Sequence, residues 1–107
     1  MNNYIIILTT VSTPVEGEKL ASILVESALA ACVNVLPKGQ SVYRWQNEII
    51  REKENLLIIK TEQSLEKKIY KKILELHSYE VPEIITINLN NIDTKYAKWI
   101  KQSLNLK

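Results

Sequence analysis

Apolar residues run almost without interruption through three parts of the chain, residues 4–12, 56–59 and 83–89. These runs are rich in β-branched side chains, which indicates strands buried on both faces. Pro82 is expected to start the last of them. A shorter run of the same character, residues 32–36, predicts a further strand.

Between these runs, apolar positions recur every three or four residues, which predicts helices. The first helix is expected to start at Thr13 and Pro14, the second to be N-capped by Ser64, and a short last helix to be capped by Asp93 and Thr94. The predicted apolar stripes consist of Leu20, Ile23, Leu24, Ala28 and Ala31 in the first helix, Leu65, Ile69, Ile73 and Leu76 in the second, and Tyr96, Trp99, Ile100 and Leu104 in the last.

Residues 41–61 form two extended runs around a weak turn at residues 46–48. Asn47 tolerates the left-handed backbone conformation that a tight hairpin needs. Just before this hairpin, the Pro-Lys-Gly sequence of residues 37–39 has the composition of a turn. We therefore expect a turn on each side of the first hairpin strand.

The resulting order, β-α-β-β-α-β followed by a C-terminal helix, predicts one α+β domain over residues 1–107 with a ferredoxin-like, split βαβ arrangement. Right-handed crossovers would place the first two helices on one face of a four-stranded sheet. The other face would be open, and a sheet this apolar should not stay exposed in a soluble monomer. We therefore expect self-association, as a closed ring or a dimer.

Charge and composition exclude several classes of partner. The 14 basic and 12 acidic side chains leave a net charge of +2, and the clustered lysines of residues 67–72 alternate with glutamates at helical spacing, as on a solvated helix face. No apolar run is long enough to span a membrane, and the first residues lack the features of a signal peptide. The single cysteine, Cys32, excludes an internal disulfide. We expect a cytoplasmic protein that binds neither nucleic acid nor membranes.

Five segments occur in an order and at distances that resemble one known family: AACVNVLP, SVYRWQNEI, LLIIKT, HSYEVPEII and YAKWI. Together they resemble the CutA family of divalent-cation tolerance proteins, from Ile5 to about Leu104. The resemblance implies a ferredoxin-like subunit, a tightly packed homotrimer and structural kinship with PII-type signalling proteins. It also implies a link to tolerance of copper and other divalent metals.

The sequence departs from the family pattern at several positions. Ser78 stands where the family usually has proline, and Asn47-Glu48 stands where its hairpin often has glycine. Some members hold additional cysteines associated with metal, whereas here Thr9 and Thr10 end the first strand and only Cys32 remains. A thiol-rich copper site is therefore not expected.

Three residues are candidate ligands for a divalent metal ion such as copper or zinc: His77, Glu83 and Cys32. His77 is the only histidine, and its spacing to Tyr79, Pro82 and Glu83 matches the resemblance. Each candidate also has a structural interpretation: His77 as a residue in the last helical turn, near the helix dipole, and Cys32 as a buried small apolar residue. The three could form one site only if folding or trimer closure brings them together.

A second candidate set comprises Tyr43, Trp45, Lys60, Tyr79 and Trp99, which would line an inter-subunit cleft or anchor an interface. With only two glycines and no nucleophile motif, the chain lacks the signatures of an enzyme. Two hypotheses follow. The first is a trimeric metal-tolerance protein that binds divalent metal weakly. The second is a PII-like signalling or scaffolding trimer that binds a small anion or a partner protein at its clefts.

Overall fold

β1 lies inside the sheet and pairs with a strand on each side. The computed structural model describes residues 3–106. Its elements are β1 (Tyr4–Val11), α1 (Pro14–Glu26), β2 (Cys32–Trp45), β3 (Glu48–Glu62), the 3₁₀ turn η1 (Gln63–Leu65), α2 (Glu66–Leu76), β4 (Ile84–Asn88) and α3 (Thr94–Ser103). The strand order is β2-β3-β1-β4, and all three pairings are antiparallel. The predicted α+β class and element order are confirmed.

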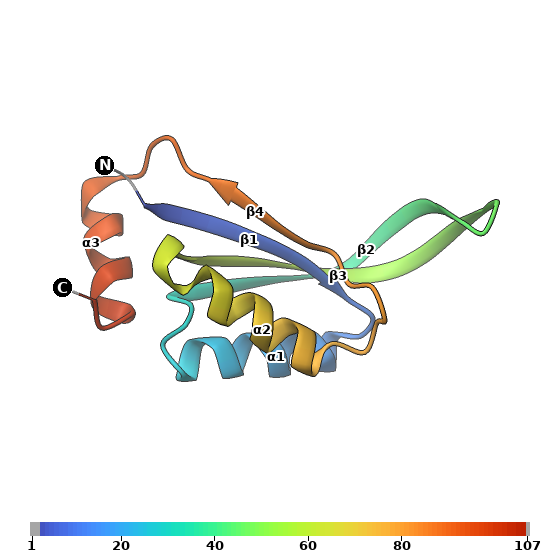
Figure 1. Cartoon of the computed structure of the whole chain (residues 1–107), viewed down its shortest axis with the longest axis horizontal. Helices are drawn as coiled ribbons and strands as arrows, with labels where there is room; N and C mark the ends of the chain where they lie inside the picture. The colour runs from blue at the N-terminus through green and yellow to red at the C-terminus, as the bar shows by residue number, and fades with distance from the viewer. Residues whose placement is uncertain (1–2, 107) are drawn as a thin grey trace.

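The two longer helices, α1 and α2, lie on one face of the sheet, and α3 lies across its end (Figure 1). Alternate residues of β1 point into the helix-covered core, together with those of β3 with which they pair. The main buried cluster is Ile5, Ile7, Val11, Leu20, Leu24, Ala30, Leu57, Ile59, Ile69 and Ile73. α3 seals the end of the sheet through Ile100 and Leu104.

The opposite face of the sheet is uncovered in the single chain. Ile85 and Ile87 of β4 are 49% and 44% exposed, and they pair with Leu8 and Ile6 of β1. On the helix-covered face, by contrast, Ile7 and Ile59 are completely buried. Within residues 3–106, no helix has the length and apolar character needed to cross a bilayer.

The caps predicted from local sequence are confirmed at two helices. The Thr13 side chain accepts a hydrogen bond from the Glu16 backbone N–H, and Pro14 opens α1. The Asp93 carboxylate accepts one from the Tyr96 N–H at the start of α3. The hairpin turn is also as predicted, because Asn47 has a φ of 67° and Gln46 joins it in the left-handed region at 49°.

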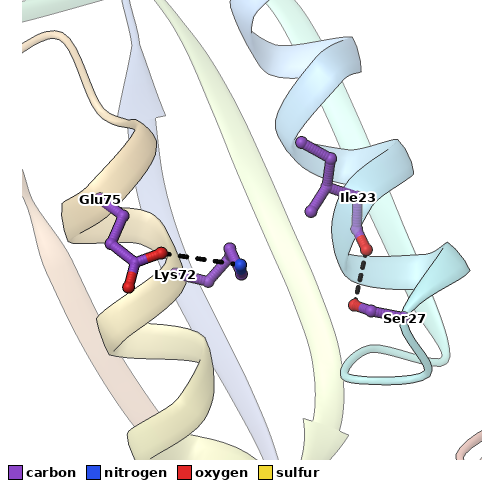
Figure 2. Close-up of polar contacts among 4 residues, drawn as sticks. All are labelled: Ile23, Ser27, Lys72 and Glu75. Carbon is purple, nitrogen blue, oxygen red and sulfur yellow. Dashed lines mark hydrogen bonds and ion pairs between the residues drawn. The ribbon is translucent and has the colours of Figure 1, made fainter.

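Two helix predictions are wrong. α1 ends at Glu26, where the Ser27 hydroxyl donates to the Ile23 carbonyl at 2.6 Å (Figure 2), so Ala28 and Ala31 lie outside its apolar stripe. Ser64 does not cap α2. Its hydroxyl donates to the Glu62 carboxylate, and η1 leads into α2 without a side-chain cap.

The outer surface of α2 carries the expected mixture of charges. Lys72 and Glu75 form an ion pair at 3.6 Å on that surface (Figure 2). This pair supports the interpretation of the lysine cluster as a solvated helix face.

Two strand boundaries also differ from the prediction. β4 begins at Ile84, two residues after Pro82. Residues 37–39 do not end a strand, because β2 continues through them as a β-bulge with Lys38 at a φ of 64°. A Cβ on Gly39 would lie 2.9 Å from the Glu54 carbonyl oxygen, so the bulge needs glycine there.

Two threonines on the helix-covered face provide a matched test of core polarity. Thr9 and Thr61 are both completely buried. The Thr61 hydroxyl donates to the Leu29 carbonyl at 2.6 Å, whereas the Thr9 hydroxyl has no partner among the described residues. Thr9→Val should leave the free energy of unfolding unchanged or raise it by about 1 kcal/mol, since it removes an unpaired buried polar group. Thr61→Val should lower it by about 1–3 kcal/mol, because it removes the hydroxyl donor from the part-buried Leu29 carbonyl.

Urea unfolding of both variants at one protein concentration measures the difference. Equal effects of the two substitutions would contradict the assigned hydrogen bonds.

Candidate functional site

The loop between α2 and β4 is fastened to the end of β1 by the His77 side chain. His77 is the C-cap of α2, and its backbone N–H donates to the Ile73 carbonyl. Its Nε2 lies 2.6 Å from the Thr10 carbonyl oxygen, and its Nδ1 accepts the Tyr79 backbone N–H at 3.0 Å. Because Nδ1 is an acceptor, the proton is on Nε2, which donates to Thr10. Thr10 lies one residue beyond the last β1 residue paired with β4. The His77 side chain therefore binds a β1 carbonyl just past the point where pairing with β4 ends.

Both ring nitrogens of His77 are therefore engaged within the chain. A neutral imidazole binds a metal through the nitrogen that carries no proton. Here that nitrogen is Nδ1, which already accepts the Tyr79 N–H. Metal binding through Nδ1 would require the loss of this bond. His77 was expected to lie within the last helical turn. Instead α2 ends one residue before it, at Leu76, and the backbone of His77 is extended.

Tyr79 links the same loop to β3. Its hydroxyl donates to the Glu54 carboxylate at 2.7 Å, and its ring lies 4.7 Å from that of His77. Glu54 is only 7% exposed, which is unusual for a carboxylate. Burial, the hydrogen bond to Glu54 and the neighbouring carboxylates together raise the pKa of Tyr79 well above its ordinary value. The phenol therefore remains a proton donor throughout the physiological pH range.

Glu16 joins the same loop to the start of α1. One carboxylate oxygen accepts from the backbone and side chain of Ser12, and the other accepts from the Ser78 N–H at 3.0 Å. Partial burial alone would raise the pKa of Glu16, but the hydrogen bonds from Ser78 and Ser12 outweigh it and hold the pKa below its ordinary value. We call Thr10, Glu16, Glu54, His77, Ser78 and Tyr79 the loop cluster.

The three predicted metal ligands are not gathered within one chain. Cys32 is half-buried at the start of β2, opposite Lys60 of β3. Thr10, the partner of His77, lies opposite Leu56, four residues along the same strand and roughly 13 Å away. Glu83 is exposed just before β4. Within residues 3–106, no group of three or more His, Cys, Asp or Glu side chains is arranged to hold a metal ion.

The predicted aromatic set is likewise divided between three places. Tyr43 and Trp45 lie on the β2–β3 hairpin, where the Tyr43 hydroxyl donates to Glu52 at 2.7 Å. Tyr79 belongs to the loop cluster. At the far end of the sheet, the Lys60 ammonium lies 5.7 Å from the Tyr96 ring centroid, and Tyr96 stacks on Trp99. A cleft containing all five residues would need more than one chain.

A shallow groove of about 660 Å³ lies elsewhere, along the outside of α2. Its lining residues, some of which belong to the solvated helix face predicted from the sequence and none of which was a candidate ligand, are Glu66, Lys67, Tyr70, Lys71, Leu74 and Glu75. Glu16 and Glu54 were likewise not predicted as site residues. The spacing Thr13-x-x-Glu16 is a recognisable capping pattern that could have indicated Glu16.

Comparison with known proteins gives consistent matches along most of the chain. A family model described as CutA1 divalent ion tolerance protein matches residues 5–103. Protein CutA, chloroplastic, of Arabidopsis thaliana is 40% identical over 99 residues, which are 92% of this chain and 54% of the plant protein. The chain thus spans about half the length of that relative. The divalent-cation tolerance protein CutA of Thermus thermophilus is 36% identical over 98 residues, 92% of this chain and 95% of that protein.

Solved structures show the same similarity. The crystal structure of the divalent ion tolerance protein CutA1 from Ehrlichia chaffeensis superposes with a TM-score of 0.92 at 34% identity, covering 97% of each chain. The fold described above is therefore shared with experimentally determined structures.

The Tyr79–Glu54 hydrogen bond should contribute measurably to stability. Tyr79→Phe leaves the buried Glu54 carboxylate without this donor, and we expect it to lower the free energy of unfolding by about 1.5–3 kcal/mol. Tyr43→Phe is the matched control, because it removes a bond of the same length to Glu52 on the exposed hairpin. It should cost less than about 0.5 kcal/mol. Urea unfolding of both variants at one protein concentration tests this, and equal losses would contradict a special role for Glu54.

The Glu16 hydrogen bonds should make stability depend on pH in the acid range. Since the pKa of Glu16 is lower in the folded than in the unfolded protein, its contribution is present above the unfolded pKa and is lost as pH falls through the folded pKa. Glu16→Gln should therefore be less stable than the unmodified protein at pH 7, and the difference should shrink towards pH 3. Urea midpoints of the two proteins across this range measure it. A difference that is constant with pH would show that the carboxylate charge is not involved.

Proposed function

Because the chain belongs to the CutA1 divalent ion tolerance family, we propose that it is a homotrimeric divalent-cation tolerance protein that binds copper or another divalent metal ion weakly at its subunit boundaries. Its proposed role is binding rather than catalysis, and its proposed location is the cytoplasm. The observation that carries the trimer is the uncovered sheet face, on which Ile85 and Ile87 remain about half exposed. Apolar surface of this extent is typically covered by another protein surface.

The geometry of the free edges also supports assembly. β2 and β4 are the two outer strands of the sheet, so each has one side without a neighbouring strand. Unpaired strand edges readily accept another strand. A chain with two such edges and one uncovered apolar face can be surrounded by copies of itself, and a contact between two different patches closes into a ring when the rotation between subunits permits.

Assembly is also the route by which the proposed metal ligands could meet. Cys32 lies at the α3 end of the sheet, whereas His77 and Glu83 lie near the other end of β1. Thiolate, imidazole and carboxylate are all ligands for copper or zinc. Of the three, the Glu83 carboxylate is exposed, and His77 would have to give up its bond from the Tyr79 N–H. This requirement agrees with weak rather than tight binding.

Native mass spectrometry of protein purified without chelator tests the assembly and any retained ion together. We expect a mass three times that of the subunit. A single-subunit species at micromolar concentration would contradict the proposal.

Calorimetric titration with Cu²⁺ and Zn²⁺ tests the ligands. Cys32→Ser and Glu83→Gln should each weaken metal binding by at least about tenfold, which is the loss that even second-shell changes cause at metal sites. His77→Ala should do the same, but it also removes the bond to Thr10, so the other two variants carry the conclusion. Glu80→Gln, in the same loop and also exposed, is the control. Metal binding that survives both Cys32→Ser and Glu83→Gln would refute the assigned ligands.

A further inference from the structure

The shallow groove along α2 is a surface that neither the core nor the proposed metal site uses. It has a volume of about 660 Å³, and its lining residues run from Glu66 to Glu75. The Tyr70 and Thr86 hydroxyls share a hydrogen bond at 2.7 Å, so this side of α2 lies beside β4, an outer strand of the sheet. The groove is on the helix-covered side of the sheet, opposite the face on which the proposed trimer rests. Covering that face would leave the groove exposed.

The groove contains an apolar strip. Leu74 is 58% exposed, whereas Ile69 and Ile73, which face the core, are completely buried. A single exposed leucine is common on protein surfaces, but this one lines a groove together with an aromatic ring. Leu74 follows Tyr70 by four residues, so the two side chains are neighbours on one side of the helix. Because Thr86 holds the Tyr70 hydroxyl, the ring is already fixed in place before any partner binds.

The charges along the groove are unevenly partnered. Glu75 forms an ion pair with Lys72 at 3.6 Å, and Glu66 lies in the first turn of α2, where the helix dipole favours a carboxylate. Lys67 and Lys71 are exposed and lie one helical turn apart. In the described part of the chain, neither of these two lysines has a carboxylate at ion-pair distance. The groove therefore has unpartnered positive charge beside its apolar strip.

The structure that complements this arrangement is an amphipathic helix with acidic residues. Such a helix lies in a groove through apolar side chains three or four positions apart, which is the spacing of Tyr70 and Leu74. Two carboxylates one turn apart on that helix would face Lys67 and Lys71. A bilayer is a poorer fit, because a helix that lies on a membrane inserts a broad apolar face. The broad apolar face of α2 is already packed into the core.

We propose that the groove along α2 binds an acidic amphipathic helix of a partner protein. The apolar stripe of that helix packs on Tyr70 and Leu74, and its carboxylates pair with Lys67 and Lys71. None of these four residues is a proposed metal ligand. The contact is therefore a second binding activity, which goes beyond the proposed metal tolerance and does not depend on it.

Fluorescence anisotropy with a defined peptide tests the contact. The probe is a fluorescein-labelled, end-capped peptide of about five helical turns. It has leucine every three or four residues and two glutamates one turn apart beside that stripe. We expect saturable binding that weakens as salt rises, since exposed charge pairs are screened. A peptide of the same composition in scrambled order lacks the stripe and should not bind. An ordered peptide that binds no better than the scrambled one would overturn the proposal.

Three variants assign the binding to this groove. Lys67→Glu with Lys71→Glu should weaken peptide binding by at least about tenfold, because like charges then meet. A peptide with lysines in place of the two glutamates should bind this variant better than it binds the unmodified protein, which also shows that the variant is folded. Leu74→Ser should weaken binding by about fivefold, because it removes apolar contact. Lys95→Glu with Lys98→Glu makes the same change in net charge on the exposed surface of α3 and should have no effect.

Other occupants would give different results. Co-sedimentation with phosphatidylglycerol vesicles that depends on Lys67 and Lys71, without peptide binding, would make the groove a membrane contact and refute the proposal. A species of twice the assembled mass in native mass spectrometry, lost in Leu74→Ser, would make a second copy the occupant and refute it as well. Peptide binding that the α2 and α3 charge reversals weaken equally would show that the peptide does not bind in this groove.

Discussion

The rest of this structure depends on one constraint. Two helices cover one face of a four-stranded sheet, and no other described element covers the opposite face. α1 and α2 completely bury the inward side chains of β1 and β3. The C-terminal helix, which could in principle have crossed the second face, seals the end of the sheet instead. Several outward side chains are nevertheless apolar, with isoleucine paired to leucine or isoleucine between β1 and β4. Such a face lowers its free energy only by leaving water, and in this chain that means contact with another surface.

The loop cluster shows how a residue with the chemistry of a ligand can serve primarily to hold the fold. The chain must leave α2, cross the end of β1 and enter β4 within a few residues, and polar backbone groups along this path lack ladder partners. His77 satisfies a β1 carbonyl and a loop N–H with one ring, and Glu16 satisfies a second loop N–H. Metal binding by His77 then competes with a hydrogen bond that the loop already has. To bind His77, a metal ion would have to compensate for the loss of this hydrogen bond. At a preformed coordination site the ligand atoms carry no such bond.

The features that the sequence predicts correctly are those determined by interactions between residues close together in the chain. Thr13, Asp93 and Asn47 act on backbone groups within three residues, and the cap or turn at each was predicted correctly. The Pro-Lys-Gly sequence was read as a turn because its composition is that of a turn. Only pairing with β3, where Gly39 closely approaches Glu54, shows it to be a bulge. Ser64 was expected to cap α2, but its hydroxyl donates to the Glu62 carboxylate two residues earlier in the chain. The buried carboxylate of Glu54 depends on a phenol 25 residues further along the chain, for which no local pattern exists.

The direction of assembly bears on whether the proposed metal ligands can meet. Cys32 and His77 lie at different ends of the core sheet, so neither can reach the other within a chain. A twofold contact through one shared patch brings different residues together only in reciprocal pairs, so it joins two subunits and no more. A head-to-tail contact instead places one region of a subunit against a different region of the next. The proposed ring of three subunits uses that second geometry. A shared site built from Cys32 of one subunit and the loop of another is therefore compatible with the head-to-tail arrangement, and the separation within one chain becomes a reason for the protein to assemble before it binds metal.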